Sequence, residues 1–150
     1  MSTAEFHEHL QSRQYDFVVK ANWTVIQSNS SVPTITLNGL KTLPNFVRFE
    51  NDGHLVLDVI ELDEYVEFCN KGDVALHHLQ TMPVGVKFMN DGHVQFYRLE
   101  YISDDTVFQN QGQISGAYSS MLLLAQAQKQ LGLYQTQGPN EITPKFRAKF

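Results

Sequence analysis

A repeat of about twenty residues runs through most of this 150-residue chain and limits what it can fold into. Four successive copies carry phenylalanine, asparagine two residues later, and glycine two residues after that. A period of this length is typical of solenoid proteins, in which each copy forms one coil and stacks on the next. The three columns of equivalent residues are Phe49, Phe68, Phe88 and Phe108; Asn51, Asn70, Asn90 and Asn110; and Gly53, Gly72, Gly92 and Gly112.

Aliphatic residues at fixed offsets complete each copy, giving the unit V-x-F-x-N-x-G-x-V-x-L-x-x-L-x-x-L-P-x-x. Its two alternating runs, V-x-F and V-x-L, indicate two short strands whose apolar side chains share one face. The leucine-type position after the second run holds Ile60, Leu79 and Leu99. One copy cannot bury such a face alone, so neighbouring copies must stack as parallel ladders around a continuous apolar interior.

The Asn-x-Gly segment joins the two runs at a corner of the coil. We expect each glycine to supply the positive φ of a tight turn, and the asparagines to form an internal ladder that satisfies backbone amides. A degenerate earlier copy covers residues 25–45, with Asn29 in the asparagine column and about two extra residues around Pro33. We interpret the phenylalanine, asparagine and glycine columns as structural.

Both ends carry the signals of helices that could cover the terminal coils. Ser2 and Glu5 match a capping box, and Phe6 and Leu10 would share one face of the helix that follows. At the other end, the serine pair at 119–120 can cap a helix over residues 121–131. Solenoids need such caps because their terminal coils otherwise expose apolar surface and strand edges.

The predicted fold is therefore mainly β: one domain, a parallel β-solenoid of about four to five coils with a helix at each end. We divide the chain into an N-terminal cap (1–24), solenoid coils (25–116), a C-terminal helical cap (117–133) and an extended C-terminal arm (134–150). The arm ends in Lys-Phe-Arg-Ala-Lys-Phe, in which cations and apolar residues alternate. This alternation is typical of a segment that adds to a sheet edge.

The V-x-L-x-x-L-x-x-L-P rhythm over residues 25–115 resembles the short leucine-rich repeats of bacterial and viral proteins. In that family asparagine usually follows the strand, whereas here it precedes it, and V-x-F-x-N adds a second strand. A two-sided β-solenoid is therefore the alternative to a curved horseshoe. The repeat is also similar to repeats in small uncharacterised phage and bacterial proteins. The resemblance implies a binding scaffold and supplies no catalytic residues.

Composition and motifs narrow the function classes. The net charge of −5 argues against direct nucleic-acid binding, and no apolar run is long enough to span a membrane. The polar, acidic start does not resemble a signal peptide, and the single cysteine, Cys69, forms neither an internal disulfide nor a cysteine-based zinc site. Common catalytic motifs are missing. We expect a non-enzymatic protein without cofactor or metal, in the host cytoplasm or in a virion.

One column of the repeat combines ionisable residues. His54 and His93 occupy equivalent positions two coils apart, with Asp73 between them in the same column. At about 4.8 Å per coil the imidazoles would lie roughly 10 Å apart, too far to share a metal ion. We expect solvated corner residues; the alternative is a His-Asp-His ladder that binds a cation or alters histidine pKa values.

Outward positions of the second strand form the predicted partner surface. Gln95 lies beside the core positions, and Asp58, His77 and Tyr97 lie just beyond them in successive copies. In leucine-rich repeats this strand face is the usual partner surface, and tyrosine commonly anchors interfaces. Three residues of the arm complete the candidate set: Phe146, Arg147 and Phe150.

Charge is concentrated in the solenoid, where residues 46–105 carry four cations and twelve acids, 4 − 12 = −8. From these features we expect a protein-binding scaffold, for example a phage structural or assembly component, that binds a protein or self-associates through the strand face or the arm. The alternative is a small acidic inhibitor of a host defence or nucleic-acid-processing protein, acting by protein binding or nucleic-acid mimicry.

Overall fold

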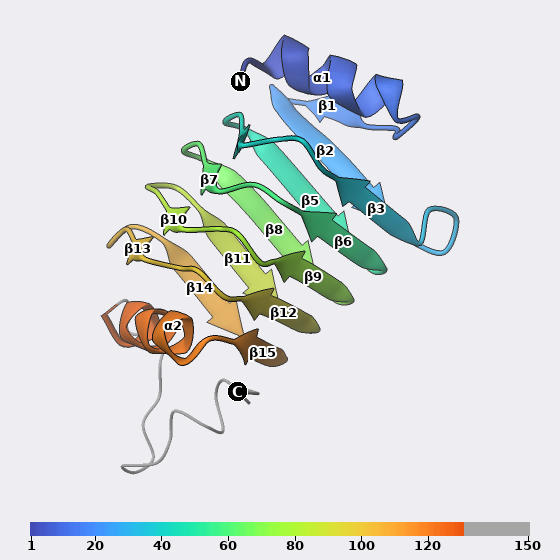
Figure 1. The fold of residues 1–150 in the computed structure, drawn as a ribbon. Coiled ribbons are helices and arrows are strands. Elements are labelled where there is room, and N and C mark those ends of the chain that lie inside the picture. Colours follow the sequence, from blue (N-terminus) through green and yellow to red (C-terminus); the bar gives the residue numbers. More distant parts are fainter. Residues whose placement is uncertain (131–150) are drawn as a thin grey trace.

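Parallel strands stacked coil upon coil form the body of the protein in the computed structural model, which describes residues 1–130 (Figure 1). The predicted β-solenoid is confirmed, with about five turns, a short N-terminal helix and a C-terminal helix. The helices are α1 (Thr3–Ser12) and α2 (Tyr118–Gln130). The strands are β1 (Val18–Lys20), β2 (Trp23–Ser28), β3 (Thr34–Leu37), β4 (Thr42–Leu43), β5 (Val47–Asn51), β6 (His54–Leu57), β7 (Glu61–Leu62), β8 (Val66–Asn70), β9 (Asp73–Leu76), β10 (Thr81–Met82), β11 (Lys87–Asn90), β12 (His93–Phe96), β13 (Tyr101–Ile102), β14 (Val107–Asn110) and β15 (Gln113–Gly116).

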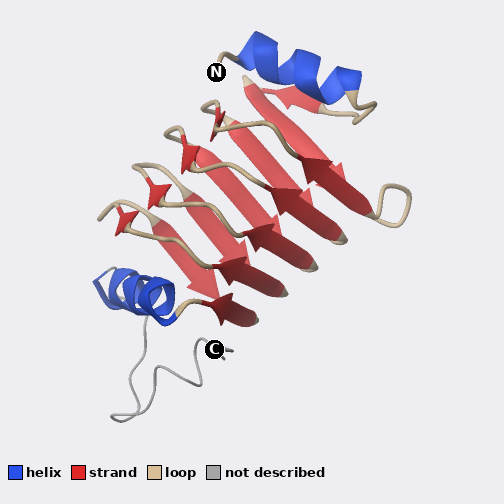
Figure 2. Ribbon diagram, in the orientation of Figure 1, coloured by secondary structure: helices blue, strands red, loops and turns tan. Residues whose placement is uncertain are grey.

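Each coil has two sides built of longer strands and a third side with short strands (Figure 2). The first sheet has the order β1-β2-β5-β8-β11-β14, and the second has the order β15-β12-β9-β6-β3. On the third side β4 pairs with β7, and β10 pairs with β13. Equivalent positions of neighbouring copies are cross-strand partners, so that Phe68 lies between Phe49 and Phe88.

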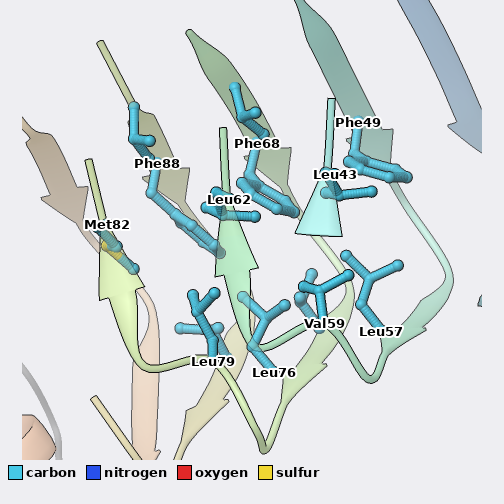
Figure 3. Close-up of a cluster of buried hydrophobic side chains, with 14 of the residues drawn as sticks. Leu43, Phe49, Leu57, Val59, Leu62, Phe68, Leu76, Leu79, Met82 and Phe88 are labelled. Carbon is cyan, nitrogen blue, oxygen red and sulfur yellow. The ribbon is translucent and has the colours of Figure 1, made fainter. Parts of the chain in front are cut away.

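The apolar interior is organised around the phenylalanine column of the first sheet (Figure 3). All four rings are buried, and the centroids of adjacent rings are 5.3, 4.8 and 5.3 Å apart. Leucine-type side chains of the second sheet and the third side, such as Leu62 and Leu76, are buried with them in the same core. Each ring adds about 1.5–3 kcal/mol from burial and about 0.5–1.5 kcal/mol from ring contacts.

The predicted asparagine ladder is present at the corner between the two sheets. The Nδ2 atoms of Asn51, Asn70 and Asn90 donate to the Oδ1 atom of the next asparagine at 2.8, 2.7 and 2.7 Å. Each Nδ2 also donates to the carbonyl of the glycine two residues later. The ladder is buried, so it satisfies polar groups that would otherwise lack partners inside the coil.

The repeat glycines have a different role from the predicted one. Positive φ occurs at Gly39, Gly85 and Gly116, but at none of the four glycines of the repeat column. A Cβ on Gly72 would lie 2.1 Å from the carbonyl oxygen of Gly53 in the preceding coil. The prediction of positive φ was therefore wrong: glycine is needed because the corners of successive coils stack too closely for a side chain.

The first turn departs from the alignment made from the sequence. Ser28, and not Asn29, lies opposite Asn51, and its hydroxyl contacts the Oδ1 atom of Asn51. Strand β2 lies 23 positions before β5, whereas β3 lies 20 positions before β6, so the first turn has 23 − 20 = 3 extra residues and not about two. The insertion forms the loop between these strands and displaces Asn29 from the ladder.

A second difference from the predicted core occurs in the copy that begins at Phe49, which is one residue shorter than the next two copies. Val59 is fully buried, whereas Ile60, which the repeat assigns to the core, is 36% exposed. Phe49 and Phe68 are separated by 19 residues, and the missing residue falls in the segment after Leu57. Val59 therefore takes the core position that Leu79 occupies in the next coil.

Helices cover the two ends of the coil stack (Figure 1). The capping box of α1 is present, and Phe6 and Leu10 are buried in the core as predicted. Helix α2 begins at Tyr118, three residues earlier than predicted, and the predicted residues 131–133 lie outside the described part of the chain. Ser120 is therefore inside the helix, where its hydroxyl accepts a hydrogen bond from the Leu99 N–H.

Candidate functional site

Side chains that point away from the core of the second sheet form the surface that we call the strand face. Cross-strand pairing places equivalent residues of successive coils side by side. Because alternate residues of a strand point to the same side, this surface consists of parallel columns that run along the solenoid. The columns contain His54, Asp73, His93 and Gln113; Val56, Ala75, Gln95 and Ser115; and, two positions further along the chain, Asp58, His77, Tyr97 and Ala117.

Three of the predicted partner residues form a cluster in which His77 contacts both Gln95 and Tyr97. The Nε2 atom of His77 is hydrogen-bonded to the Oε1 atom of Gln95, and the His77 and Tyr97 rings meet edge to face with centroids 4.9 Å apart. Tyr97 remains 45% exposed, and Val56 on the same face is 40% exposed. The three side chains thus form one contact cluster that leaves the Tyr97 ring half-exposed.

Asp58, the fourth predicted residue, is engaged by the preceding coil. Its carboxylate accepts hydrogen bonds from the backbone N–H groups of Gly39 at 2.9 Å and Leu40 at 3.4 Å. Gly39 has a φ of +83°, so this carboxylate binds the backbone of a left-handed turn. The structure thus gives Asp58 a contact that stabilises the coil.

The histidine column brings its three members together. The Nδ1 atom of His54 lies 3.3 Å from Oδ2 of Asp73, and the Nδ1 atom of His93 lies 3.5 Å from Oδ1. Beside them is a hollow of about 250 Å³ over β6, β9 and β12. Ala75, which lies between its cross-strand neighbours Val56 and Gln95 and has a smaller side chain than either, lines this hollow. The sequence predicted the column, but not the hollow beside it.

Ser115, which belongs to the neighbouring column of Gln95, contacts the histidine column in a way that the sequence did not indicate. The Nε2 atom of His93 contacts the Ser115 hydroxyl, so Ser115, His93 and Asp73 are connected in the order found in hydrolytic triads. Ser115 is only 7% exposed, although the alternation of residues along β15 places it in the same outward column as Gln95. A hydrolytic serine must reach the substrate carbonyl carbon, so this burial does not favour a nucleophilic role.

The outer face of the first sheet carries a separate polar network. Arg48 pairs with Glu50 at 3.0 Å and with Glu67 at 2.7 Å, and Gln27 donates to Glu50 at 2.6 Å. The hydrogen bonds from Gln27 and Arg48 lower the pKa of Glu50. Burial raises the pKa of Cys69, which lies beside this network, and the nearby Arg48 acts in the opposite direction. A thiol with a raised pKa is a poor nucleophile at neutral pH.

Within residues 1–130, no group of three or more histidine, cysteine, aspartate or glutamate side chains is placed to hold a metal ion. In the same part of the chain, neither helix has the length and apolar character needed to cross a bilayer. Of the predicted partner residues, Phe146, Arg147 and Phe150 lie outside the described residues.

The fold and the strand face together define this chain as a β-solenoid repeat protein with caps at both ends. Comparison with protein-family models, with curated proteins and with solved structures gives no match. Any functional conclusion therefore depends on the residues and geometry of the chain itself.

Proposed function

We propose that this protein is a non-enzymatic protein-binding scaffold whose partner contacts the strand face. The observation that carries the proposal is the contact cluster of His77, Gln95 and Tyr97, which presents a half-exposed aromatic ring from two adjacent coils. Tyrosine is enriched at the energetic centres of protein interfaces, because a large, rigid ring gives contact area at little entropic cost.

The scaffold beneath this cluster supports the same conclusion. Each strand of the second sheet pairs with a neighbouring coil, and the phenylalanine column and the asparagine ladder fix the coils to one another. Side chains on such a platform need little reorganisation on binding, which lowers the entropic cost of association.

The proposal is tested by capture of partners from an extract of the native host. Wild-type protein is compared with the double variant His77→Ala/Tyr97→Ala, which removes exposed side chains without changing the core. The matched control is Met89→Ala/Gln109→Ala, which removes two exposed, adjacent side chains from the first sheet. We expect the first variant to lose the partner and the control to retain it. Equal capture by all three proteins would place the interface elsewhere.

A more specific version of the scaffold proposal rests on the resemblance of the repeat to short leucine-rich repeats and to repeats in phage proteins. In this form the chain is a phage structural or assembly component in the virion or in the cytoplasm of the host. The 20-residue unit and its V-x-L-x-x-L-x-x-L-P rhythm support it. Neighbouring genes test it: virion genes are expected, and a setting among unrelated metabolic genes would contradict it.

A second candidate function is inhibition of a host defence or nucleic-acid-processing protein. The observation that favours it is a group of exposed acids along the third side of the coil and its flanking loops: Glu61, Asp63, Glu64, Glu100, Asp104 and Asp105. Such a surface could occupy a basic site that normally holds nucleic acid. Under this function, a duplex oligonucleotide would displace the captured partner. A partner that binds the chain and the duplex together would exclude mimicry.

Self-association through the C-terminal arm remains a further part of the proposal. The arm alternates cations with Phe146, Ala148 and Phe150, the pattern of a segment that pairs with a sheet edge. We expect deletion of residues 140–150 to abolish self-association or partner binding while the melting temperature stays within about 4 °C, because the predicted core lies elsewhere. A truncated protein that assembles and binds like the full chain would refute this role.

A further inference from the structure

The hollow on the strand face has a shape and a charge that point to one kind of ligand. Its lining includes the small, apolar Ala75 and Val56, with Asp73 on one side, between the two histidines, and Gln95 on another. Asp73 and Ala75 are two positions apart along β9, so their Cα atoms lie roughly 6.6 Å apart and their side chains point to the same side of the sheet. An apolar surface next to a carboxylate suits a side chain with an aliphatic stem and a cationic end.

Asp73 has the capacity to bind such a cation. Its side chain is 53% exposed, and its ion-pair partners among residues 1–130 are the two imidazoles, with neither lysine nor arginine among them. The Nδ1 atoms of His54 and His93 lie 3.3 and 3.5 Å from the two oxygens, which is long for hydrogen bonds, so each carboxylate oxygen retains accepting capacity.

We propose that this hollow binds an arginine side chain of the protein partner. The guanidinium group pairs with both oxygens of Asp73, and the aliphatic stem lies over Ala75 and Val56. Arginine is favoured over lysine because its planar fork matches a carboxylate in two parallel hydrogen bonds. The surrounding solenoid supports a basic ligand, since residues 46–105 carry a charge of 4 − 12 = −8.

This inference rests on the proposed function, because it assigns a chemical class to the partner of the strand face. It also adds a residue that the sequence did not place in the partner site. Asp73 and Ala75 lie on β9, and His77 comes two positions after Ala75, just beyond the end of that strand. A partner that places an arginine beside Asp73 can therefore cover Tyr97 with neighbouring residues of the same segment, which links the hollow to the aromatic cluster.

Titration of the isotope-labelled full chain with short peptides tests the inference by amide chemical shifts. The probes are acetylated and amidated Gly-Arg-Gly, Gly-Lys-Gly and Gly-citrulline-Gly, of which the last keeps the shape of arginine without its charge. Low ionic strength is used because salt screens exposed pairs. We expect saturable shifts at Val56, Ala75 and Gln95 with the arginine peptide, weaker shifts with the lysine peptide and none with citrulline.

Two matched variants decide whether Asp73 is responsible. We expect Asp73→Asn to weaken arginine-peptide binding about tenfold, as loss of a charge-assisted hydrogen bond does, and Asp91→Asn, an exposed acid of the next coil, to leave it unchanged. Equal weakening by both variants, or shifts spread over all acidic positions, would overturn the inference. Tighter peptide binding by Arg147→Gln would also overturn it, because the chain's own arm would then be the occupant.

The test separates this inference from the function on which it rests. If Asp73→Asn keeps the host partner while His77→Ala/Tyr97→Ala loses it, the arginine site is refuted and the scaffold function stands. If neither variant loses the partner, both proposals fail.

Discussion

Replacement of Asn70 by alanine tests how the coils are held together. Asn70 is 2% exposed; its Nδ2 donates to Asn90 at 2.7 Å and to the carbonyls of Gly72 and His93 at 3.1 Å. Its Oδ1 accepts from the side chain of Asn51 at 2.8 Å. The alanine variant removes both of these side-chain links, so the ladder is interrupted between the first and second asparagines and between the second and third.

The expected cost follows from the groups that lose a partner. The Oδ1 atom of Asn90 loses the Asn70 donor, and the Nδ2 atom of Asn51 loses one of its acceptors. A buried polar group left without a partner costs about 1–3 kcal/mol, so we expect Asn70→Ala to lower the free energy of unfolding by roughly 3–5 kcal/mol. The control is Asn45→Ala at an exposed position, which we expect to cost less than about 0.5 kcal/mol.

Urea unfolding of the full chain, followed by circular dichroism, measures both values. Equal unfolding midpoints for the two variants would refute the reasoning, because the ladder would then contribute nothing beyond an exposed asparagine. A loss confined to Asn70→Ala supports the view that polar ladders, together with the rings, join one coil to the next.

Three further predictions concern the core, the corner and the first sheet. Phe88→Ala removes a buried ring that stacks on two neighbours and should cost roughly 3–5 kcal/mol, whereas the exposed Asp91→Ala should cost less than about 0.5 kcal/mol; equal melting temperatures would contradict the inward placement of the ring. Gly72→Ala should cost at least about 2 kcal/mol in chemical unfolding, because its Cβ would meet the Gly53 carbonyl oxygen; an unchanged midpoint would contradict the close stacking of the corners. Because the pKa of Glu50 is lowered in the folded state, its carboxylate stabilises the protein above the usual glutamate range and loses this effect as the pH falls; the stability difference between wild type and Glu50→Gln should therefore shrink from pH 7 to pH 3, and a constant difference would be the contrary result.

Much of the architecture could be predicted because the repeat constrains each coil in the same way. Equivalent residues must become neighbours when copies stack, so the phenylalanine column and the asparagine ladder followed directly from the spacing. The N-terminal helix was predictable from the capping pair of Ser2 and Glu5, which is a local signal.

The failed predictions concern copies of the repeat that have extra or missing residues, and positions whose role depends on how closely neighbouring coils approach. Asn29 is not part of the ladder because three residues are inserted after Ser28. Val59, and not Ile60, lies in the core because the copy that begins at Phe49 is one residue short. The role of the glycines was not predicted because a sequence does not show which atoms a side chain at that position would meet. A Cβ on Gly72 would lie 2.1 Å from the carbonyl oxygen of Gly53 in the preceding coil.

The candidate site was predicted in part. His77, Gln95 and Tyr97 were predicted to lie near one another because they occupy adjacent outward positions in neighbouring coils. Alternation gives the direction of a side chain and not its exposure, so the burial of Ser115 was not predictable. The hollow beside Asp73 depends on the small size of Ala75 relative to its cross-strand neighbours, which only the stacked coils reveal.

Photocrosslinking from matched positions on the two sheets tests most directly whether the strand face binds the partner. Benzoylphenylalanine is placed at Val56 on the second sheet or at Met89 on the first; the native side chains are 40% and 38% exposed, so both probes have similar access to solvent. Each variant is irradiated in an extract of the native host. We predict a crosslinked partner from position 56 and none from position 89; a partner captured from position 89 alone would contradict the central claim.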